Sequence, residues 1–300
     1  MDMNERVGWI GLGMMGQPMA QRLSEHFEVV AYDANQDRYT GAPGVVGAAS
    51  LRDALSHVTA IFLSLPNSDA VQAVCLGDDG IERHAQPGTV VFDMSTTEPT
   101  VSRRIHQILE RKDIAFIDSP VSGGPAGAQS GTLSIMAGCD ADQWDLVHRW
   151  LSHLGTSVVR VGDVGSGGVA KLVNNMIVGG AFVAVAEGFA VAASQGVDIE
   201  ALHAAIRSGW AQSKVLDLSA DAVIAGDFAP TGTVDLLSKD LGYARNLARQ
   251  AHVPIPLTSI VDEVFTSAKA SGRGGSFQAV IITLWERLMG ITIAGRKKHD

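Results

Sequence analysis

The pattern of apolar residues changes once along this chain, near residue 163. Before that point, short runs rich in Val, Ile and Phe alternate with segments of helical periodicity. The runs that predict strands are RVGWI, FEVVAYD, AIFLSL, TVVFDM, IAFIDS, TLSIMAG and SVVRVG. Because strands that alternate with helices pair side by side in the same direction, this pattern predicts an α/β fold with a mostly parallel, doubly wound sheet.

The remainder of the chain predicts helices only. The expected ranges are 167–195, 198–208, 212–225, 236–250, 257–271 and 277–290. The chain has 300 residues, of which 46% are hydrophobic, which is enough to form two cores. We therefore predict two domains, with an α/β sheet domain over residues 1–163 and an all-helical domain over residues 164–300.

A glycine motif follows the first predicted strand. Gly11, Gly13 and Gly16 form G-x-G-x-x-G directly before a helical pattern, where such a loop lets the backbone approach a pyrophosphate. Asp33 ends the second strand, 20 residues after Gly13, where a carboxylate can accept the ribose hydroxyls. The motif predicts a Rossmann domain, and the alternative is a glycine turn with a surface Asp. The expected cofactor-binding residues here are Gly11, Gly13, Met14, Met15, Gly16 and Asp33.

The cofactor is expected to be NAD, since a carboxylate at Asp33 would repel a 2′-phosphate. Arg38 lies nearby in the sequence, so NADP is possible. Further strand ends contribute Leu65 and Pro66 in SLPNS and Thr96 in DMSTTEP. An open α/β sheet holds its ligand at the carboxyl ends of its strands, although each of these residues also fits an ordinary polar turn.

Three further segments carry candidate chemistry. In DSPVSGG, Ser122, Gly123 and Gly124 could offer hydroxyl and backbone N–H donors to a carboxylate, or form only a turn. In GGVAKLVNN, Lys171 and Asn175 are four residues apart and share a helix face. A lysine there can exchange a proton with a substrate hydroxyl, or it can extend to solvent from a helix end. The third segment, LLSKDLGYA, places Lys239 and Asp240 in a helix, where they could equally be a solvated helix start.

The composition limits the partners. A net charge of −9 argues against nucleic acid and anionic membrane surfaces, so the expected partner is a small molecule. Cys75 and Cys139 have no second ligand at metal spacing, and the mixed N-terminus makes a poor signal peptide; we expect no metal and a cytoplasmic location. Residues 176–193 are nearly all apolar but contain Glu187, so we expect a helix buried between domains or subunits rather than a membrane span.

Four segments, in this order, resemble the β-hydroxyacid dehydrogenase family, which includes 3-hydroxyisobutyrate dehydrogenase and tartronate semialdehyde reductase. They are IGLGMMGQPMAQRL, DSPVSGGPAGAQSGTL, GSGGVAKLVNN and SKDLGYA, and the resemblance covers nearly the whole chain. It implies a Rossmann domain, a long interdomain helix and an all-helical domain, assembled as a homodimer or homotetramer.

The resemblance also implies roles for individual residues. Lys171 matches the catalytic lysine, and Asn175 matches the residue that orients the substrate with it. Ser122, Gly123 and Gly124 match the loop that binds the substrate carboxylate. Thr96 and Lys239 match residues near both the substrate and the cofactor.

The expected activity is an NAD(P)-dependent oxidation of a small 3-hydroxy acid, or reduction of the matching semialdehyde, with a lysine as general acid and base. An imine-reductase-like enzyme and a non-catalytic cofactor-binding protein are the alternatives. Relatives of the former kind generally lack the lysine. Near the C-terminus, relatives often read GxxDxSAV where this chain reads GRGGSFQAV, with Ser276 and Gln278 at the nearest positions. Because this segment is commonly close to the substrate in the family, the substrate of a relative cannot be assigned to this chain. Trp210 in SGWAQS either lines the pocket or fills the core at a helix end.

Overall fold

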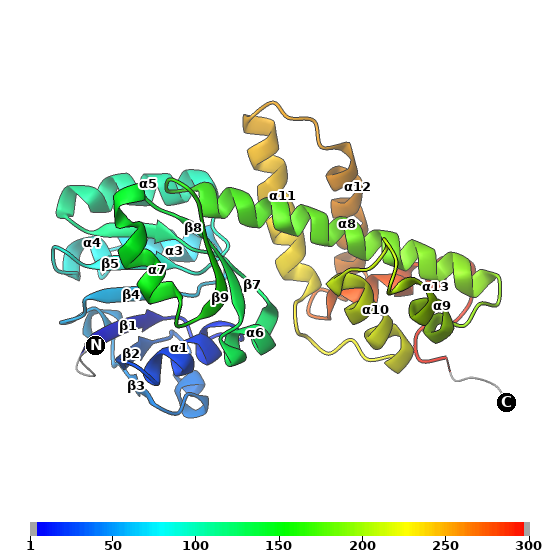
Figure 1. Ribbon diagram of the computed structural model, residues 1–300, viewed down its shortest axis with the longest axis horizontal. Coiled ribbons are helices and arrows are strands. Elements are labelled where there is room, and N and C mark those ends of the chain that lie inside the picture. The colour runs from blue at the N-terminus through cyan, green and yellow to red at the C-terminus, as the bar shows by residue number, and fades with distance from the viewer. Residues whose placement is uncertain (1–4, 297–300) are drawn as a thin grey trace. The chain divides into compact units, whose positions relative to one another are not determined.

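The computed structural model describes residues 5–296, which form two compact units (Figure 1). The sheet unit is Met1–Lys171 and the helical unit is Leu172–Asp300. The sequence places the boundary at 163/164, in the turn between the last strand and the long helix that follows it. The division between the units falls a few residues later, within that helix.

The sheet unit contains one large sheet of mostly parallel strands. The strands are β1 (Arg6–Ile10), β2 (Glu28–Tyr32), β3 (Val45–Gly47), β4 (Ala60–Leu63), β5 (Val90–Asp93), β6 (Ala115–Asp118), β7 (Val121–Ser122), β8 (Leu133–Gly138) and β9 (Gly155–Gly162). Their order is β3-β2-β1-β4-β5-β6-β8-β7, with β9 paired to β8, and only the β6–β8 and β7–β8 pairs are antiparallel. The prediction of a doubly wound sheet is confirmed. The sequence pattern missed β3 and β7, which are too short to show periodicity.

Helices connect these strands and supply both faces of the sheet with apolar side chains. They are α1 (Gly16–Ser24), η1 (Gln36–Gly41), α2 (Leu51–Ala54), α3 (Ser68–Leu76), α4 (Ile81–His84), α5 (Pro99–Leu109), η2 (Glu110–Lys112), α6 (Gly124–Ser130), η3 (Ala141–Gln143) and α7 (Trp144–Leu151). One core packs α1 and α7 against alternate strand residues, and the other packs α3 and α5 against the residues between them. The strands are therefore buried on both sides, as a parallel sheet requires.

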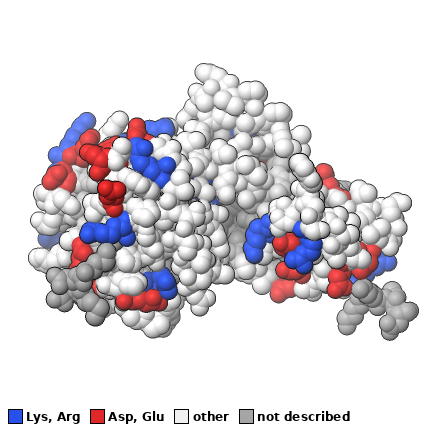
Figure 2. Space-filling model, in the orientation of Figure 1, with Lys and Arg blue, Asp and Glu red and all other residues white. Residues whose placement is uncertain are grey.

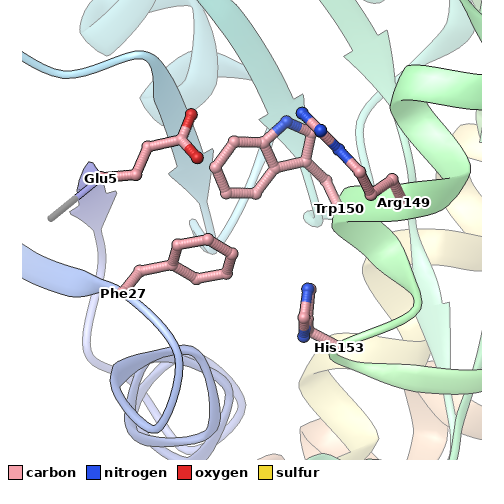
Figure 3. A pocket seen from close by; sticks show the side chains of 5 residues that line it. All are labelled: Glu5, Phe27, Arg149, Trp150 and His153. Carbon is pink, nitrogen blue, oxygen red and sulfur yellow. The ribbon is translucent and has the colours of Figure 1, made fainter. Parts of the chain in front are cut away.

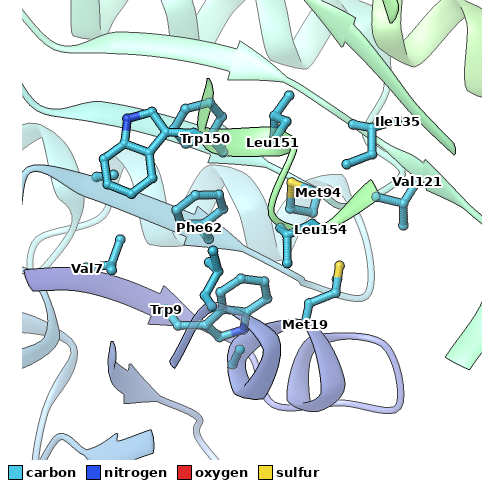
Figure 4. Close-up of a cluster of buried hydrophobic side chains, with 14 of the residues drawn as sticks. Val7, Trp9, Met19, Phe62, Met94, Val121, Ile135, Trp150, Leu151 and Leu154 are labelled. Atoms are coloured by element: carbon cyan, nitrogen blue, oxygen red, sulfur yellow. The ribbon is translucent and has the colours of Figure 1, made fainter. Parts of the chain in front are cut away.

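Aromatic stacking organises the first of these cores (Figure 4). Trp9 of β1 stacks on Phe62 of β4 with ring centroids 5.5 Å apart, and Phe62 stacks on Phe92 of β5 at 4.7 Å. Trp150 of α7 contacts Phe62 edge-on. Trp9 is completely buried, so its role is packing beneath the glycine loop.

The helical unit continues from the long helix α8 (Ser166–Ser194). The other helices are α9 (Ile199–Ile206), α10 (Lys214–Ala225), α11 (Val234–Gln250), α12 (Pro256–Ala270), η4 (Gln278–Ile281) and α13 (Ile282–Met289). The side chains of Asp198, Ser213 and Thr233 cap α9, α10 and α11. These helices confirm the predicted ranges, except that the last range divides into η4 and α13.

Among residues 5–296, α8 alone is long and apolar enough, by length and composition, to cross a membrane. Of its most apolar stretch, 44% is buried within the chain. The side chains of Val173, Ile177 and Val191 remain exposed along it. The helix is therefore half covered by its own chain and retains an uncovered apolar strip.

Candidate active site

Close backbone contacts shape the glycine loop between β1 and α1. Gly11 has a φ of +98°, and a Cβ atom there would overlap the carbonyl oxygen of Ser64 at the end of β4. A Cβ atom on Gly16 would overlap the carbonyl oxygen of Gly11. Gly13 is open, with only Arg38 Nη1 near it, at 3.9 Å from the position of a Cβ atom. The loop therefore fits a dinucleotide fingerprint, because its backbone is both tightly turned and uncovered at Gly13.

Asp33 is buried beside this loop rather than lying on the surface. Its Oδ2 accepts a hydrogen bond from Leu12 N at 2.7 Å, and its Oδ1 accepts one from Asn35 N at 2.8 Å. Arg38 Nη1 lies 3.1 Å from Oδ2. The alternative of a surface Asp is wrong. The carboxylate fixes the loop between Gly11 and Gly13 and holds a guanidinium next to it.

The turns that follow β4 and β5 are joined by hydrogen bonds. Leu65 N donates to Ser95 Oγ at 2.9 Å, and Ser95 N donates to Asp93 Oδ1 at 3.0 Å. Thr97 Oγ1 donates to Asp93 Oδ2 at 2.6 Å. The predicted residues Leu65, Pro66 and Thr96 therefore lie at the carboxyl ends of β4 and β5, at the same edge of the sheet as Gly11. This edge is where open α/β sheets bind ligands.

The segment Ser122–Gly124 joins the last residue of β7 to the first residue of α6. Gly123 and Gly124 have φ values of +137° and +65°, which disfavour any residue with a side chain. A Cβ atom on Gly124 would meet nothing within 4 Å, so the glycine is required by the backbone and leaves open space above it. Both readings of this segment, a carboxylate loop and a simple turn, fit this geometry.

Lys171 is directed at this same loop. Its Nζ donates to the carbonyl oxygen of Val121 at 2.7 Å, and Val121 directly precedes Ser122. The side chain is only partly exposed. A lysine that extends to solvent would leave this carbonyl, so the structure instead places the ammonium beside Ser122 and the two glycines.

A buried carboxylate connects the candidate residues of the helical unit. Asp240 Oδ2 accepts from Asn175 Nδ2 at 2.6 Å, and Asp240 Oδ1 accepts from Lys239 Nζ at 2.8 Å. Lys239 also lies 4.7 Å from the ring centroid of Tyr243. Asp240 is 6% exposed and lies in the second turn of α11, so the alternative of a solvated helix start is wrong. Asp240 was expected only as a candidate in LLSKDLGYA with no assigned role, although its spacing of three residues from Leu237 indicates the buried face of the helix.

A second buried carboxylate, Asp118, was also missed. It ends β6 and is 1% exposed, and both of its oxygen atoms accept backbone N–H groups at the start of α8. Burial raises the pKa of Asp118 to about 7, against the lowering effect of the N–H groups of Gly165 and Gly168; nearby Asp93 raises it further. An Asp at the end of an otherwise apolar strand, as in IAFID, is the signal in the sequence.

The segment that departs from the family pattern supports the start of α11. Val234 N donates to the carbonyl oxygen of Ser276 at 3.0 Å, and Gln278 Nε2 donates to that of Thr233 at 3.4 Å. Thr233 also forms an isolated β-bridge with Phe277. Trp210 is fully exposed, so the alternative that it fills the core is wrong.

Two hollows in the surface lie away from these residues. The first is lined by Glu5, Phe27, Arg149, Trp150 and His153 (Figure 3). Glu5 and Phe27 directly precede β1 and β2, so this hollow lies at the amino end of the sheet, opposite the glycine loop. The second, of about 660 Å³, lies in the helical unit and is lined by none of the predicted site residues. Within residues 5–296 there is no cluster of three or more His, Cys, Asp or Glu side chains suited to a metal.

A doubly wound sheet with this glycine loop, followed by a long helix that carries a lysine, is typical of nicotinamide-dependent oxidoreductases. Comparisons with known proteins give the family. Residues 6–162 match the model of the NAD-binding domain of 6-phosphogluconate dehydrogenase. Residues 165–285 match the model of the NAD-binding domain of NADP-dependent 3-hydroxyisobutyrate dehydrogenase.

Individual proteins agree with the two models. The chain is 31% identical to 2-(hydroxymethyl)glutarate dehydrogenase of Eubacterium barkeri, over 98% of this chain and 99% of that protein. A crystal structure of 3-hydroxyisobutyrate dehydrogenase from Salmonella typhimurium superposes with a TM-score of 0.84 at 26% identity, covering 94% and 100% of the two chains. Imine reductase from Pseudomonas sp. shares the fold alone, with a TM-score of 0.61 at 18% identity over 93% of this chain and 99% of that chain.

The chain therefore belongs to the β-hydroxyacid dehydrogenase family. Within that family it is an NAD(P)-dependent oxidoreductase that acts on the CH–OH group of a hydroxy acid or on the matching carbonyl.

Proposed function

We propose that this enzyme oxidises a small 3-hydroxy acid to its semialdehyde, or catalyses the reverse reduction, with Lys171 as general acid and base. The observation that carries the proposal is the 2.7 Å hydrogen bond from Lys171 Nζ to Val121, which holds the ammonium beside Ser122–Gly124. By their names, 2-(hydroxymethyl)glutarate dehydrogenase and 3-hydroxyisobutyrate dehydrogenase both take acids with a hydroxymethyl group on the carbon next to a carboxylate. A substrate of that kind places its carboxylate and its hydroxyl a short distance apart, which fits a donor loop next to an amine.

A protein group can be assigned to substrate binding, to proton transfer and to substrate orientation. The Ser122 hydroxyl and the backbone N–H groups of Gly123 and Gly124 bind the carboxylate. In the oxidation direction, neutral Lys171 takes the proton from the hydroxyl. In reduction, the ammonium form returns a proton to the same oxygen. Asn175, held by Asp240, donates to or accepts from the substrate oxygen and fixes its orientation.

When bound, a nicotinamide cofactor would supply the hydride acceptor for the carbon that bears the hydroxyl. The protein residues that would hold the cofactor are those of the glycine loop, Asp33, the turns after β4 and β5, and Lys239. The open backbone at Gly13 and the N-terminus of α1 fit a pyrophosphate. The resemblance to the family assigns Thr96 and Lys239 to residues near the cofactor and the substrate.

NAD is the proposed preferred cofactor, with NADP accepted less well. The buried carboxylate of Asp33 can still accept a ribose hydroxyl, and it repels a 2′-phosphate. Arg38, which lies beside both Asp33 and Gly13, offsets that repulsion in part. An Arg38→Ala variant should therefore increase the KM for NADP more than the KM for NAD.

The uncovered apolar side chains support a homo-oligomer, either a dimer or a tetramer. Val173, Ile177 and Val191 of α8 and Leu257 and Ile260 of α12 are all largely exposed. On the face shown in Figure 2, the outer end of the α11–α12 pair carries no charged side chain. Several exposed apolar side chains on neighbouring turns of a helix favour a subunit interface over a solvent-facing surface. Sedimentation equilibrium of the wild type should give a mass of two or four chains, and the Ile177→Asp variant should give a mass closer to that of one chain.

The remaining proposals concern partners and location. Lysine and arginine side chains are interspersed with acidic ones on the face in Figure 2, which, with the net charge of −9, supports a small-molecule partner over nucleic acid or a membrane. Cys75 and Cys139 are both buried free thiols, which favours a reducing cytoplasm. Cell fractionation with an antibody to the chain tests this location.

A substrate panel tests the proposed reaction. Reduced-nicotinamide absorbance would be followed with NAD and with NADP for 3-hydroxyisobutyrate, glycerate, 3-hydroxypropionate, serine and four-carbon sugar acids, and for the semialdehydes in reverse. We expect turnover of at least one acid with a hydroxymethyl group next to its carboxylate. Turnover of cyclic imines alone would indicate the imine-reductase alternative, and cofactor binding with no turnover would indicate a non-catalytic protein.

A further inference from the structure

The start of α8 has an unusual cap. The first helical residue is Ser166, so the position that normally supplies a capping side chain is Gly165, which has none and has a φ of +93°. Instead, Asp118 Oδ1 accepts from Gly165 N and Asp118 Oδ2 accepts from Gly168 N, both at 2.7 Å. One carboxylate on strand β6 therefore satisfies two of the free N–H groups at this helix end.

Glycines around the carboxylate make this contact possible. A Cβ atom on Gly138 of β8 would overlap Asp118 Oδ1. A Cβ atom on Gly167 would overlap the carbonyl oxygen of Met136 and lie 3.0 Å from Asp118 Oδ2. The start of α8 and strand β8 thus approach Asp118 closely, so its position leaves little freedom for the first turn of α8.

The same short segment of chain contacts α8 a second time. Val121, three residues after Asp118, accepts the hydrogen bond of Lys171 Nζ. Lys171 is three residues beyond Gly168, which is less than one helical turn. The carboxylate therefore fixes the helix next to the lysine, and the carbonyl fixes the end of the lysine side chain.

We propose that Asp118 is the positioning residue of this active site: by capping α8 from β6, it sets the direction in which Lys171 points at the Ser122–Gly124 loop. The inference rests on the proposed role of Lys171 in proton transfer. Asp118 itself touches backbone N–H groups of the protein, so it acts through Lys171 and is not a catalytic residue.

The Asp118→Asn variant tests this inference because it keeps the shape and removes one acceptor. Its amide can accept from one N–H group and turns a second N–H donor toward the other, so either orientation leaves a helix amide unpaired. Asp262→Asn is the matched control. Asp262 of α12 is likewise a buried carboxylate, and it pairs with Arg245 of α11 within the helical unit.

Two measurements follow the position of α8 without any substrate. Hydrogen–deuterium exchange reports the amides of residues 165–168, and acetylation with an N-hydroxysuccinimide ester, read by mass spectrometry, reports Lys171 against exposed Lys112 as internal reference. In Asp118→Asn we expect faster exchange at 165–168 and a several-fold rise in Lys171 acetylation. In Asp262→Asn both should stay at the wild-type value, even where its melting temperature falls.

Activity is the third measurement, made with the best substrate of the panel. Asp118→Asn should lower kcat about 10-fold to 100-fold, the range expected when a reacting group is displaced by about 1 Å, while the Kd for NADH stays unchanged. If Asp118→Asn is not folded by circular dichroism, Asp118→Ser replaces it, since a hydroxyl is smaller and accepts from one of the two amides.

The outcomes separate this inference from the proposed function. Unchanged exchange and acetylation in a folded variant would overturn it, and so would altered acetylation with an unchanged kcat. If acetylation of Lys171 changes in Asp118→Asn but the wild type turns over no acid of the panel, the role proposed for Lys171 in proton transfer would be overturned. The effect of Asp118 on catalysis would then be overturned with it.

Discussion

The two units hold their candidate residues in different ways. In the sheet unit, the contacts are made mainly to backbone groups: Asp33 and Asp118 accept backbone N–H groups, and Lys171 donates to a backbone carbonyl. In the helical unit, the contacts join side chains: Asp240 accepts from both Asn175 and Lys239. Candidate residues can therefore be held by backbone groups in one unit and by a buried side chain in the other.

The largest expected effect comes from Lys171→Ala in the sheet unit. Removing the general acid and base should lower kcat by about 10²-fold to 10⁴-fold while the Kd for NADH is unchanged, because Lys171 contacts the Ser122 loop rather than the glycine loop. Steady-state kinetics and fluorescence titration with NADH measure the two quantities. Lys112→Ala, a change at an exposed lysine of the same unit, is the control, and an active Lys171→Ala enzyme would remove the lysine from the mechanism.

The next effect is a dependence of stability on pH that differs in sign between the units. Burial raises the pKa of Asp118 from 3.8 to about 7, so the folded protein binds a proton there that the unfolded chain has lost. The free energy of unfolding should therefore fall as the pH rises from about 4 to about 7, by up to about 4 kcal/mol for this group.

In the helical unit, the hydrogen bond from His203 lowers the pKa of Asp217. That contribution is present above the unfolded pKa and is lost as the pH falls through the lower, folded pKa. Urea unfolding across this pH range, compared with Asp118→Asn and Asp217→Asn, separates the two. A slope that is identical in the wild type and in Asp118→Asn would contradict the assignment to Asp118.

A smaller effect on rate is expected from Asp240→Ala in the helical unit. Without the carboxylate, Asn175 loses its hydrogen bond of 2.6 Å and Lys239 loses its hydrogen bond of 2.8 Å. We expect kcat to fall about 10-fold and the KM for the substrate to rise. Asp235→Ala, an exposed position on the same helix, is the control. Equal kinetics for the two variants would mean that the helical unit contributes no oriented groups.

The smallest effect distinguishes the glycines of the two units. Gly188 lies in α8 with nothing within 4 Å of a Cβ position, so Gly188→Ala should stabilise the protein by roughly 0.5 to 1 kcal/mol. The same change at Gly16 would overlap a backbone oxygen and destabilise it. Thermal melting of both variants measures the contrast, and a destabilised Gly188→Ala would show that this glycine is also needed for close contact.

The same difference explains which parts of the fold and of the candidate site could be predicted from the sequence. The doubly wound sheet and the helix ranges followed from periodicity, because buried parallel strands and amphipathic helices leave regular patterns. The glycine loop followed from spacing, since only glycine permits that turn. The roles of Asp118 and Asp240 did not follow, because their partners are backbone and side-chain groups up to 65 residues away in the sequence. The short strands β3 and β7 were missed for lack of length.

Transfer of deuterium tests the central claim most directly. The best 3-hydroxy acid of the panel, deuterated at the carbon that bears the hydroxyl, would be oxidised by the wild type and by Lys171→Ala, and the reduced cofactor would be analysed by mass spectrometry. We predict one deuterium in the cofactor from the wild type and a rate lower by at least about 10² in the variant. Reduced cofactor without deuterium, or equal rates for the two proteins, would contradict direct hydride transfer assisted by Lys171.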